Sequence, residues 1–163
     1  MVMLLSIDKE NDPDMLGMIG ASCAVGLSDI PWNGPIAAVR IGRINDQFVV
    51  NPTIEEQEVS TMNLVVAGRK GSPVMIEGGS KEISEETLVQ ALELAQNNID
   101  KLCEWQEAFF KQNGREKFHF EAVKLDETVR TQMEAKVGDK LKAALRVPEK
   151  LGLNLLGRFL KPL

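Results

Sequence analysis

The chain has few of the residues that most often build metal and redox sites. Its 163 residues include one histidine, His119, and two cysteines, Cys23 and Cys103. A zinc-type site needs closely spaced Cys or His ligands, which this set does not supply. Each cysteine lies in a predicted helical pattern among apolar neighbours. We therefore expect two buried free thiols in a reducing compartment rather than a disulfide.

Long apolar runs and an excess of positive charge are also missing. No window approaches the length of a membrane-spanning helix, and the opening MVMLLSIDKE lacks the basic region and the apolar length of a signal peptide. Net charge is −5, and Lys and Arg are scattered along the chain. This composition predicts a cytoplasmic protein without a membrane partner. It gives no support to a nucleic-acid-binding surface, although a negative net charge is compatible with a local RNA-binding surface.

The sequence contains no motif that carries catalysis. No serine lies in a G-x-S-x-G elbow, and the GRKGS run at 68–72 lacks the Walker spacing and precedes a predicted strand. The acidic run at 8–14 lacks the length and the glycine of a calcium-binding loop. We interpret Asp12 or Asp14 as a helix cap. The residues by themselves therefore indicate no catalytic group and no metal ligand.

What the sequence does contain is the alternation of helix and strand signals typical of an α+β fold. The runs after Pro35 read as a hairpin around Asn45-Asp46, then a capped helical turn at Thr53, then a second strand pair. The predicted strands are Val2–Ile7, Ile36–Ile44, Gln47–Val50, Met62–Ala67 and Pro73–Glu77. The predicted helices run from Met15 to a break at Pro31–Pro35, from a Ser84 cap to Asn113-Gly114, and from Leu125 to Pro148.

Two helices carry further expectations. The first contains Gly17, Gly20 and Gly26, which lower helix propensity, so we expect it to pack very closely against a sheet. The last presents apolar residues on one face, namely Val129, Met133, Val137 and Leu141. An apolar tail, 151–163, follows it, and we expect a short packed helix or a disordered end there rather than a membrane-surface helix.

Five spaced segments resemble one known family. They are LLSIDKENDPD, MIGASCAV, LSDIPWNGPIAAVRIGRINDQFVVNPT, NLVVAG and VMIEGGSKEISEET, and in this order they resemble the bacterial polynucleotide phosphorylase family. The resemblance covers about Leu4–Leu92 and continues more loosely to Lys150. It implies a partial first ribonuclease-PH-like core domain at 1–112, part of a helical linker domain at 113–150 and a divergent tail at 151–163.

The resemblance also implies a function. Family members are phosphorolytic 3′-to-5′ exoribonucleases that degrade mRNA: inorganic phosphate attacks the terminal phosphodiester and releases nucleoside diphosphates, with Mg²⁺ assisting. They are ring-shaped homotrimers. The implied partners are single-stranded RNA and phosphate, not DNA.

The family's catalytic and phosphate-binding residues lie in a second core domain, and its RNA-gripping loop lies early in the first. Neither set of motifs occurs in this sequence, so we expect the chain to be inactive alone. The alternative is a stand-alone, non-catalytic RNA-binding or scaffold module. In either case the candidate RNA contacts are Arg40, Arg43, Arg69 and Lys70.

Overall fold

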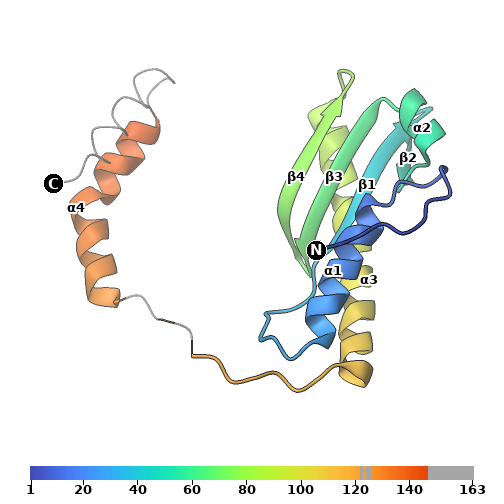
Figure 1. Cartoon of the computed structure of the whole chain (residues 1–163). Helices are drawn as coiled ribbons and strands as arrows, with labels where there is room; N and C mark the ends of the chain where they lie inside the picture. The colour runs from blue at the N-terminus through green and yellow to red at the C-terminus, as the bar shows by residue number, and fades with distance from the viewer. Residues whose placement is uncertain (122, 124–125, 147–163) are drawn as a thin grey trace. The chain divides into compact units, whose positions relative to one another are not determined.

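The structure, a computed structural model, describes residues 1–121, 123 and 126–146 (Figure 1). Two compact units divide the chain at Phe120, Met1–Phe120 and Glu121–Leu163. The first unit contains α1 (Asp14–Leu27), β1 (Ala37–Ile44), β2 (Gln47–Val50), α2 (Ile54–Val59), β3 (Met62–Arg69), β4 (Ser72–Ser80) and α3 (Glu85–Asn113); the second contains α4 (Glu127–Leu145). The predicted α+β class is confirmed.

One antiparallel sheet organises the first unit, with strand order β2-β1-β3-β4. The two predicted strand pairs are both present. Asn45 and Asp46 have φ of 48° and 64°, the left-handed values that a tight hairpin turn between β1 and β2 requires. The second turn is as short, with Lys70 and Gly71 between β3 and β4.

Helices lie on both faces of this sheet (Figure 1). Side chains alternate between faces along a strand, and the odd-numbered residues of β1 meet the even-numbered residues of β3 on the face that α3 covers. The buried core there consists of Ala37, Val39, Ile41, Met62, Leu64, Val66, Ala91, Ala95, Ile99 and Cys103. On the opposite face α1 packs on the sheet through Met15, against Ala38 and Ala67.

A buried polar group joins α1, β1 and α3. The Gln106 side chain of α3 is fully buried, and its amide oxygen accepts a hydrogen bond from Ser22 Oγ of α1 at 2.6 Å. Ser22 Oγ in turn accepts the Ile36 backbone N–H at 3.1 Å, and Gln106 Nε2 donates to the Ile36 carbonyl at 3.0 Å. These three hydrogen bonds close a ring, so each of these buried polar groups is satisfied where the two helices meet the start of the sheet.

The segment after α3 returns to the end of α1. Arg115 N–H donates to the Leu27 carbonyl at 3.0 Å, and Lys117 Nζ donates to the Gly26 carbonyl at 2.8 Å. A cation at this position satisfies carbonyls that the last helical turn leaves open. These bonds hold residues after 112 in the first unit, whereas the resemblance predicts a boundary at 112. The assignment of ranges to the family's domains stays a prediction.

Several predicted helix ends are confirmed. Thr53 and Glu56 form a reciprocal capping box at the start of α2, with bonds of 2.8 and 3.3 Å. Ser84 caps α3, which ends at Asn113 as expected.

At the first helix Pro13 occupies the N-cap position and makes no side-chain cap bond. As predicted, acidic side chains bind the free N–H groups of the first turn, since Asp12 Oδ1 accepts the Asp14 N–H at 3.2 Å and Asp14 Oδ1 accepts the Met15 N–H at 2.7 Å. Asp12 and Asp14 also pair with an arginine of β1.

The predicted strand at Val2–Ile7 does not form. None of these residues belongs to a strand, and their apolar side chains are exposed, Leu5 at 89%. Within the described residues the sheet has the order β2-β1-β3-β4, and this segment joins neither of its edges. Val2 lies beside α1 instead, 3.7 Å from a Cβ built on Gly17. The sequence of the segment has strand propensity, but a strand needs a neighbouring edge to bond with.

The reason for the glycines of α1 also differs from the prediction. A Cβ built on Gly26 would lie 2.2 Å from the ring of Phe110 in α3, so the close neighbour is a helix and not the sheet. At Gly20 nothing lies within 4 Å of such a Cβ. Only one of these two glycines is required by packing.

The apolar side chains expected on one face of α4 are largely exposed, Val129 at 52% and Met133 at 56%. Pro148 and the tail at 151–163 lie outside the described residues. In the part that the structure covers, no helix has the length and apolar character needed to cross a membrane.

Gly26 and Gly20 of α1 form a matched pair for mutation. Gly26→Ala should destabilise the first unit by about 1–3 kcal/mol, because Phe110 must move out of its packed position. Gly20→Ala should stabilise it by about 0.5–1 kcal/mol through helix propensity alone. Urea denaturation followed by circular dichroism measures both. Equal effects of the two substitutions would contradict the packing described above.

Candidate functional site

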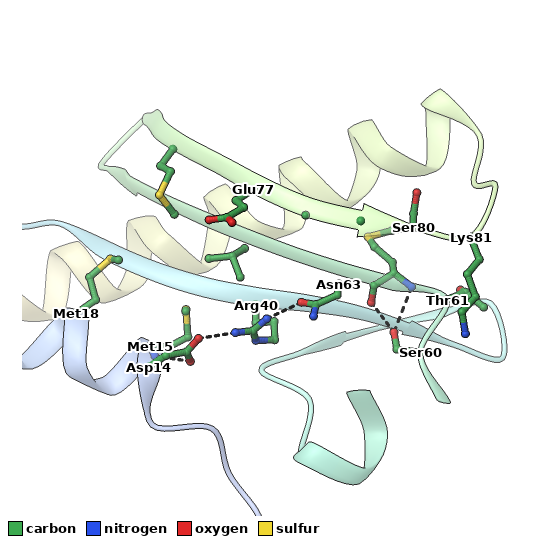
Figure 2. A pocket seen from close by; sticks show the side chains of 15 residues that line it. Asp14, Met15, Met18, Arg40, Ser60, Thr61, Asn63, Glu77, Ser80 and Lys81 are labelled. Carbon is green, nitrogen blue, oxygen red and sulfur yellow. Dashed lines mark hydrogen bonds and ion pairs between the residues drawn. The ribbon is translucent and has the colours of Figure 1, made fainter. Parts of the chain in front are cut away.

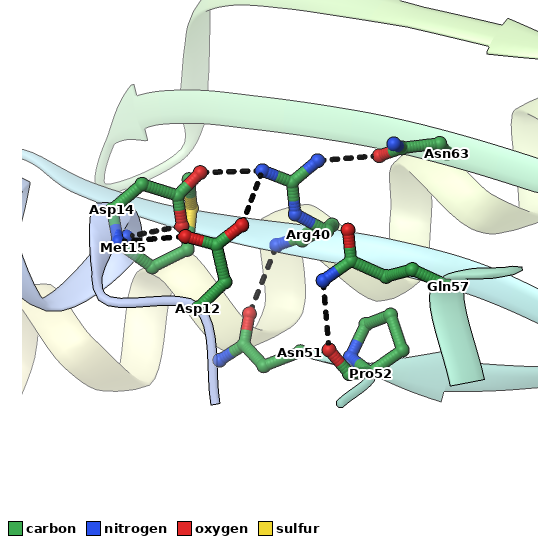
Figure 3. Close-up of polar contacts among 8 residues, drawn as sticks. All are labelled: Asp12, Asp14, Met15, Arg40, Asn51, Pro52, Gln57 and Asn63. Carbon is green, nitrogen blue, oxygen red and sulfur yellow. Dashed lines mark hydrogen bonds and ion pairs between the residues drawn. The ribbon is translucent and has the colours of Figure 1, made fainter. Parts of the chain in front are cut away.

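The first predicted RNA contact, Arg40, lies inside a polar cluster between β1 and α1 (Figure 3). Its side chain is only 13% exposed; it forms ion pairs with Asp14 and, at 3.6 Å, with Asp12. The guanidinium also donates to Asn63 Oδ1 of β3 at 2.5 Å. Two carboxylates therefore neutralise this charge, and little of it faces solvent.

The backbone of Arg40 is held as firmly as its side chain. Asn51 Oδ1 accepts the Arg40 N–H at 2.9 Å, and the Asn51 N–H donates to the Arg40 carbonyl at 2.7 Å (Figure 3). Asn51 has φ of 50°, a left-handed conformation that asparagine tolerates better than most residues. The Asn-Pro sequence thus closes the end of β2 against β1.

The other predicted contacts lie at opposite ends of the sheet. Arg43, near the end of β1, pairs with Asp46 of the hairpin turn at 2.9 Å. Arg69 and Lys70 lie where β3 turns into β4, and the register places this turn beside Ala37, at the start of β1. The structure therefore brings Arg69 and Lys70 together but not all four basic residues. RNA contact by these residues stays a prediction.

The turn between β3 and β4 is attached to α3. Gly71 N–H donates to Asp100 Oδ1 at 2.9 Å, and Lys70 Nζ pairs with Glu104 at 2.8 Å. The bond from Gly71 and a second bond from Gln96 hold the pKa of Asp100 below its ordinary value. The pKa of Lys70 is raised, chiefly by its hydrogen bond to Glu104 and the charge of that carboxylate.

A small cavity of about 310 Å³ lies beside this turn. Arg69, Lys70 and Ser72 line it from the sheet, and Glu107 lines it from α3. The acidic residues of α3 balance the two cations, so the potential at this surface is mixed rather than positive. A phosphodiester would meet Arg69 and Glu107 together.

A wide groove lies on the sheet face beside α1 (Figure 2). Its volume is about 710 Å³, and its apolar lining includes Met15, Met18, Val65 and Met75. Arg40, Asn63, Glu77 and Lys81 provide polar groups around that lining. No sequence motif marks this groove, since its residues come from four separate elements. The sequence signal that could have indicated it is the alternation of side chains between the two sheet faces along β3 and β4.

None of these surfaces assembles a reactive centre. The described residues contain no cluster of three or more His, Cys, Asp or Glu side chains able to hold a metal ion. Both cysteines are free, Cys103 buried and Cys23 half-buried, and burial raises the pKa of each thiol, which disfavours the reactive thiolate. The site can present polar and apolar contacts, but these described groups supply no nucleophile activated by a base.

The fold matches a known class of domain. Residues 34–98, from the turn before β1 into α3, match the family described as 3′ exoribonuclease family, domain 2. The crystal structure of Caenorhabditis elegans cell-death-related nuclease 5 shares the fold with a TM-score of 0.52 and 20% identity, over 64% of this chain and 58% of that chain. The first unit is therefore built around a 3′ exoribonuclease-family domain.

Relatives that align over most of the chain are more specific. The polyribonucleotide nucleotidyltransferase of Persephonella marina is 40% identical over 152 residues, which are 93% of this chain and 21% of that protein. That of Thermus thermophilus is 52% identical over 116 residues, 71% of this chain and 16% of that protein. The chain belongs to the polyribonucleotide nucleotidyltransferase (polynucleotide phosphorylase) family and spans about one fifth of the length of the first of these relatives. The predicted resemblance is confirmed.

The role of Arg40 is testable by substitution. Arg40→Met should lower the free energy of unfolding by about 1–3 kcal/mol, because Asp14 Oδ2 and Asn63 Oδ1 lose the guanidinium N–H groups that bind them. Lys70→Met, which removes a solvent-exposed ion pair, should leave that free energy nearly unchanged. Chemical denaturation of both variants measures the two free energies of unfolding. A larger loss of stability in Lys70→Met than in Arg40→Met would contradict the structural role of Arg40.

Proposed function

We propose that the chain is a non-catalytic structural segment of a phosphorolytic 3′-to-5′ exoribonuclease. In that enzyme inorganic phosphate attacks the 3′-terminal phosphodiester of single-stranded RNA and releases a nucleoside diphosphate. Supporting this is the alignment of 91–93% of the chain with relatives named polyribonucleotide nucleotidyltransferase, in organisms as different as Persephonella marina and Desulfatibacillum aliphaticivorans. A cytoplasmic location, a role in mRNA degradation and a homotrimeric assembly belong to the same proposal.

The contribution of this segment is architectural. Its hydrogen-bonded ring around Gln106 and its neutralised Arg40 cluster hold a sheet and two helices in fixed positions. Such a segment supports catalytic groups carried elsewhere by making the surfaces next to them rigid.

The Mg²⁺ that the family resemblance implies does not fit the described residues. Asp12 and Asp14 form an acidic pair, but both carboxylates already bind the Arg40 guanidinium. Within the described residues no third acidic ligand joins them. A hard divalent cation prefers several oxygen ligands without a competing cation. We therefore derive no chemical step through a metal held by these residues.

The second candidate function is RNA binding without catalysis. The observation that favours it is the pairing of Arg69 and Lys70 at one exposed turn, next to a cavity that also contains Ser72. Contacts of this kind to phosphates are sequence-independent and weaken with salt. This role is compatible with the architectural one.

Two assays test the proposal. The purified chain, incubated with single-stranded RNA, phosphate and Mg²⁺, should release no nucleoside diphosphate, whereas the complete Thermus thermophilus relative serves as the active control. Robust release by the chain alone would contradict the proposal. Replacing the matching segment of that relative with residues 34–98 of this chain should retain phosphorolysis, because the segment supplies a fold rather than reactive groups.

A folded chimera with no activity would mean that residues 34–98 have more than an architectural role.

The second candidate function, RNA binding without catalysis, is tested by a separate measurement. Binding of fluorescent single-stranded RNA should weaken in Arg69→Ala/Lys70→Ala and stay unchanged in Glu93→Gln, an exposed substitution on α3. Equal binding by both variants would exclude the turn as the RNA contact.

A further inference from the structure

The last turn of α1 lacks a local group that would stabilise the end of the helix. The last carbonyls of any α-helix have no partner within the helix. A lysine or arginine nearby often donates to them and offsets their partial negative charge. The last turn of α1 contains no basic residue. In α1 the missing donors come from a distant part of the sequence.

The segment 114–118, which follows α3, carries the lysine that binds these carbonyls. Lys117 Nζ donates to the carbonyl of Val25 at 3.2 Å and to that of Gly26 at 2.8 Å, and it also donates to the carbonyl of Ser28. An ammonium group has three N–H donors. The donors of Lys117 are therefore matched one for one with three carbonyls at the end of α1.

Backbone groups on either side of this lysine make the same connection. The Arg115 N–H donates to the Leu27 carbonyl at 3.0 Å, and the Phe118 N–H donates to the Asp29 carbonyl at 2.9 Å. Together with the bonds of Lys117, five hydrogen bonds join the segment to residues 25–29. A single side chain provides three of the five.

The packing of α3 against α1 places the segment where it can make these bonds. The Phe110 ring of α3 lies so close to Gly26 that a Cβ built there would be 2.2 Å from it. A Cβ built on Gly114, the C-cap of α3, would lie 3.6 Å from the Gly26 carbonyl oxygen. The chain therefore leaves α3 directly beside the end of α1.

The five bonds also reach the beginning of the loop 28–35, which joins α1 to β1. Ser28 and Asp29 are its first residues, and Ser28 Oγ accepts the Ile30 N–H at 3.2 Å. Just after the loop, Ile36 is bonded into the ring around Gln106. The loop is thus attached at both ends. Loss of the first attachment frees one end and leaves the other in place.

The same loop contributes to the cavity beside the turn between β3 and β4. Asn33, Gly34 and Pro35 line that cavity together with Arg69 and Lys70. Gly34 has φ of 106°, a value that glycine adopts far more readily than other residues, so this wall depends on one particular backbone conformation. A loop with one free end would sample other conformations, and the cavity would lose a fixed wall.

We propose that the segment 114–118 is a conformational latch with a docked and a released state. In the docked state Lys117 holds it on the end of α1 and thereby orders the loop 28–35 and the cavity wall. Release frees the loop while the sheet and the core beneath α3 stay folded. Such local openings occur at free energies well below that of global unfolding. The shape of the cavity thus depends on a contact that lies outside it.

Native-state hydrogen exchange of the full chain, followed by NMR, tests the latch. Lys117→Met removes all three side-chain donors, so the amides of Arg115 and Phe118 should exchange about tenfold faster or more. The amide of Ile99, in the buried core beside the sheet, should exchange as in the wild type. The control Lys101→Met removes the same charge from an exposed position of α3 and should leave all of these rates unchanged.

Fluorescence tests the loop itself. Trp32 lies in the loop and is half-buried, and it becomes the only tryptophan in a Trp105→Phe background. Phenylalanine at position 105 can keep the stacking that Trp105 makes on Phe109. In this background Lys117→Met should increase acrylamide quenching of Trp32 and shift its emission to longer wavelength. Lys101→Met should change neither property.

Three results would overturn the proposal. The first is wild-type exchange at Arg115 and Phe118 in Lys117→Met. The second is faster exchange at these amides with unchanged quenching of Trp32, because the segment would then not order the loop. The third is an equal acceleration at Ile99, because Lys117 would then stabilise the whole unit rather than a local latch.

Discussion

The side chain of Gln106 is the contact on which the first unit depends. Two helices on opposite faces of a sheet share no direct core, so something must fix α1 relative to α3. The amide of Gln106 does so by bonding Ser22 of α1 and the backbone of Ile36 just before β1. A buried amide is costly unless its hydrogen bonds are made, and here the same bonds that satisfy it also join three elements. The contact of Gly26 with Phe110 lies beyond it, toward the ends of both helices.

This joint explains why the two faces of the sheet differ. The glutamine brings the C-terminal half of α1 against α3, so only the N-terminal half of α1 lies on the sheet, through Met15. The face over β3 and β4 stays open as a methionine-lined groove, and the edge of β4 stays unpaired.

Local signals in the sequence were sufficient for most of the fold. The Asn45-Asp46 turn, the Thr53 capping box and the Ser84 cap act within a few residues, so their chemistry is visible in the sequence itself. Long-range contacts were not predictable in this way. No local pattern indicates that Gly26 meets Phe110, or that Val2–Ile7 finds no strand partner.

In the candidate site, too, local features were predictable from the sequence and long-range contacts were not. The sequence identifies Arg40 as a basic residue but not that Asp12 and Asp14 neutralise it, because the pairing depends on how α1 lies across β1. Ser22 and Gln106 are likewise separated by 84 positions, and a polar residue in a helical pattern ordinarily reads as solvent-exposed. Arg69 and Lys70 were predictable as a pair only because they are neighbours in the chain.

Native-state hydrogen exchange of the wild type and of Gln106→Leu tests whether Gln106 holds α1 in place. Leucine leaves the Ser22 hydroxyl proton without the Gln106 acceptor and the Ile36 carbonyl without the Gln106 donor, which should cost about 1–3 kcal/mol. We expect this loss to appear first in the amides of α1, while the β1–β3 ladder keeps most of its protection. Unchanged protection of α1 in the variant would contradict the role given to Gln106.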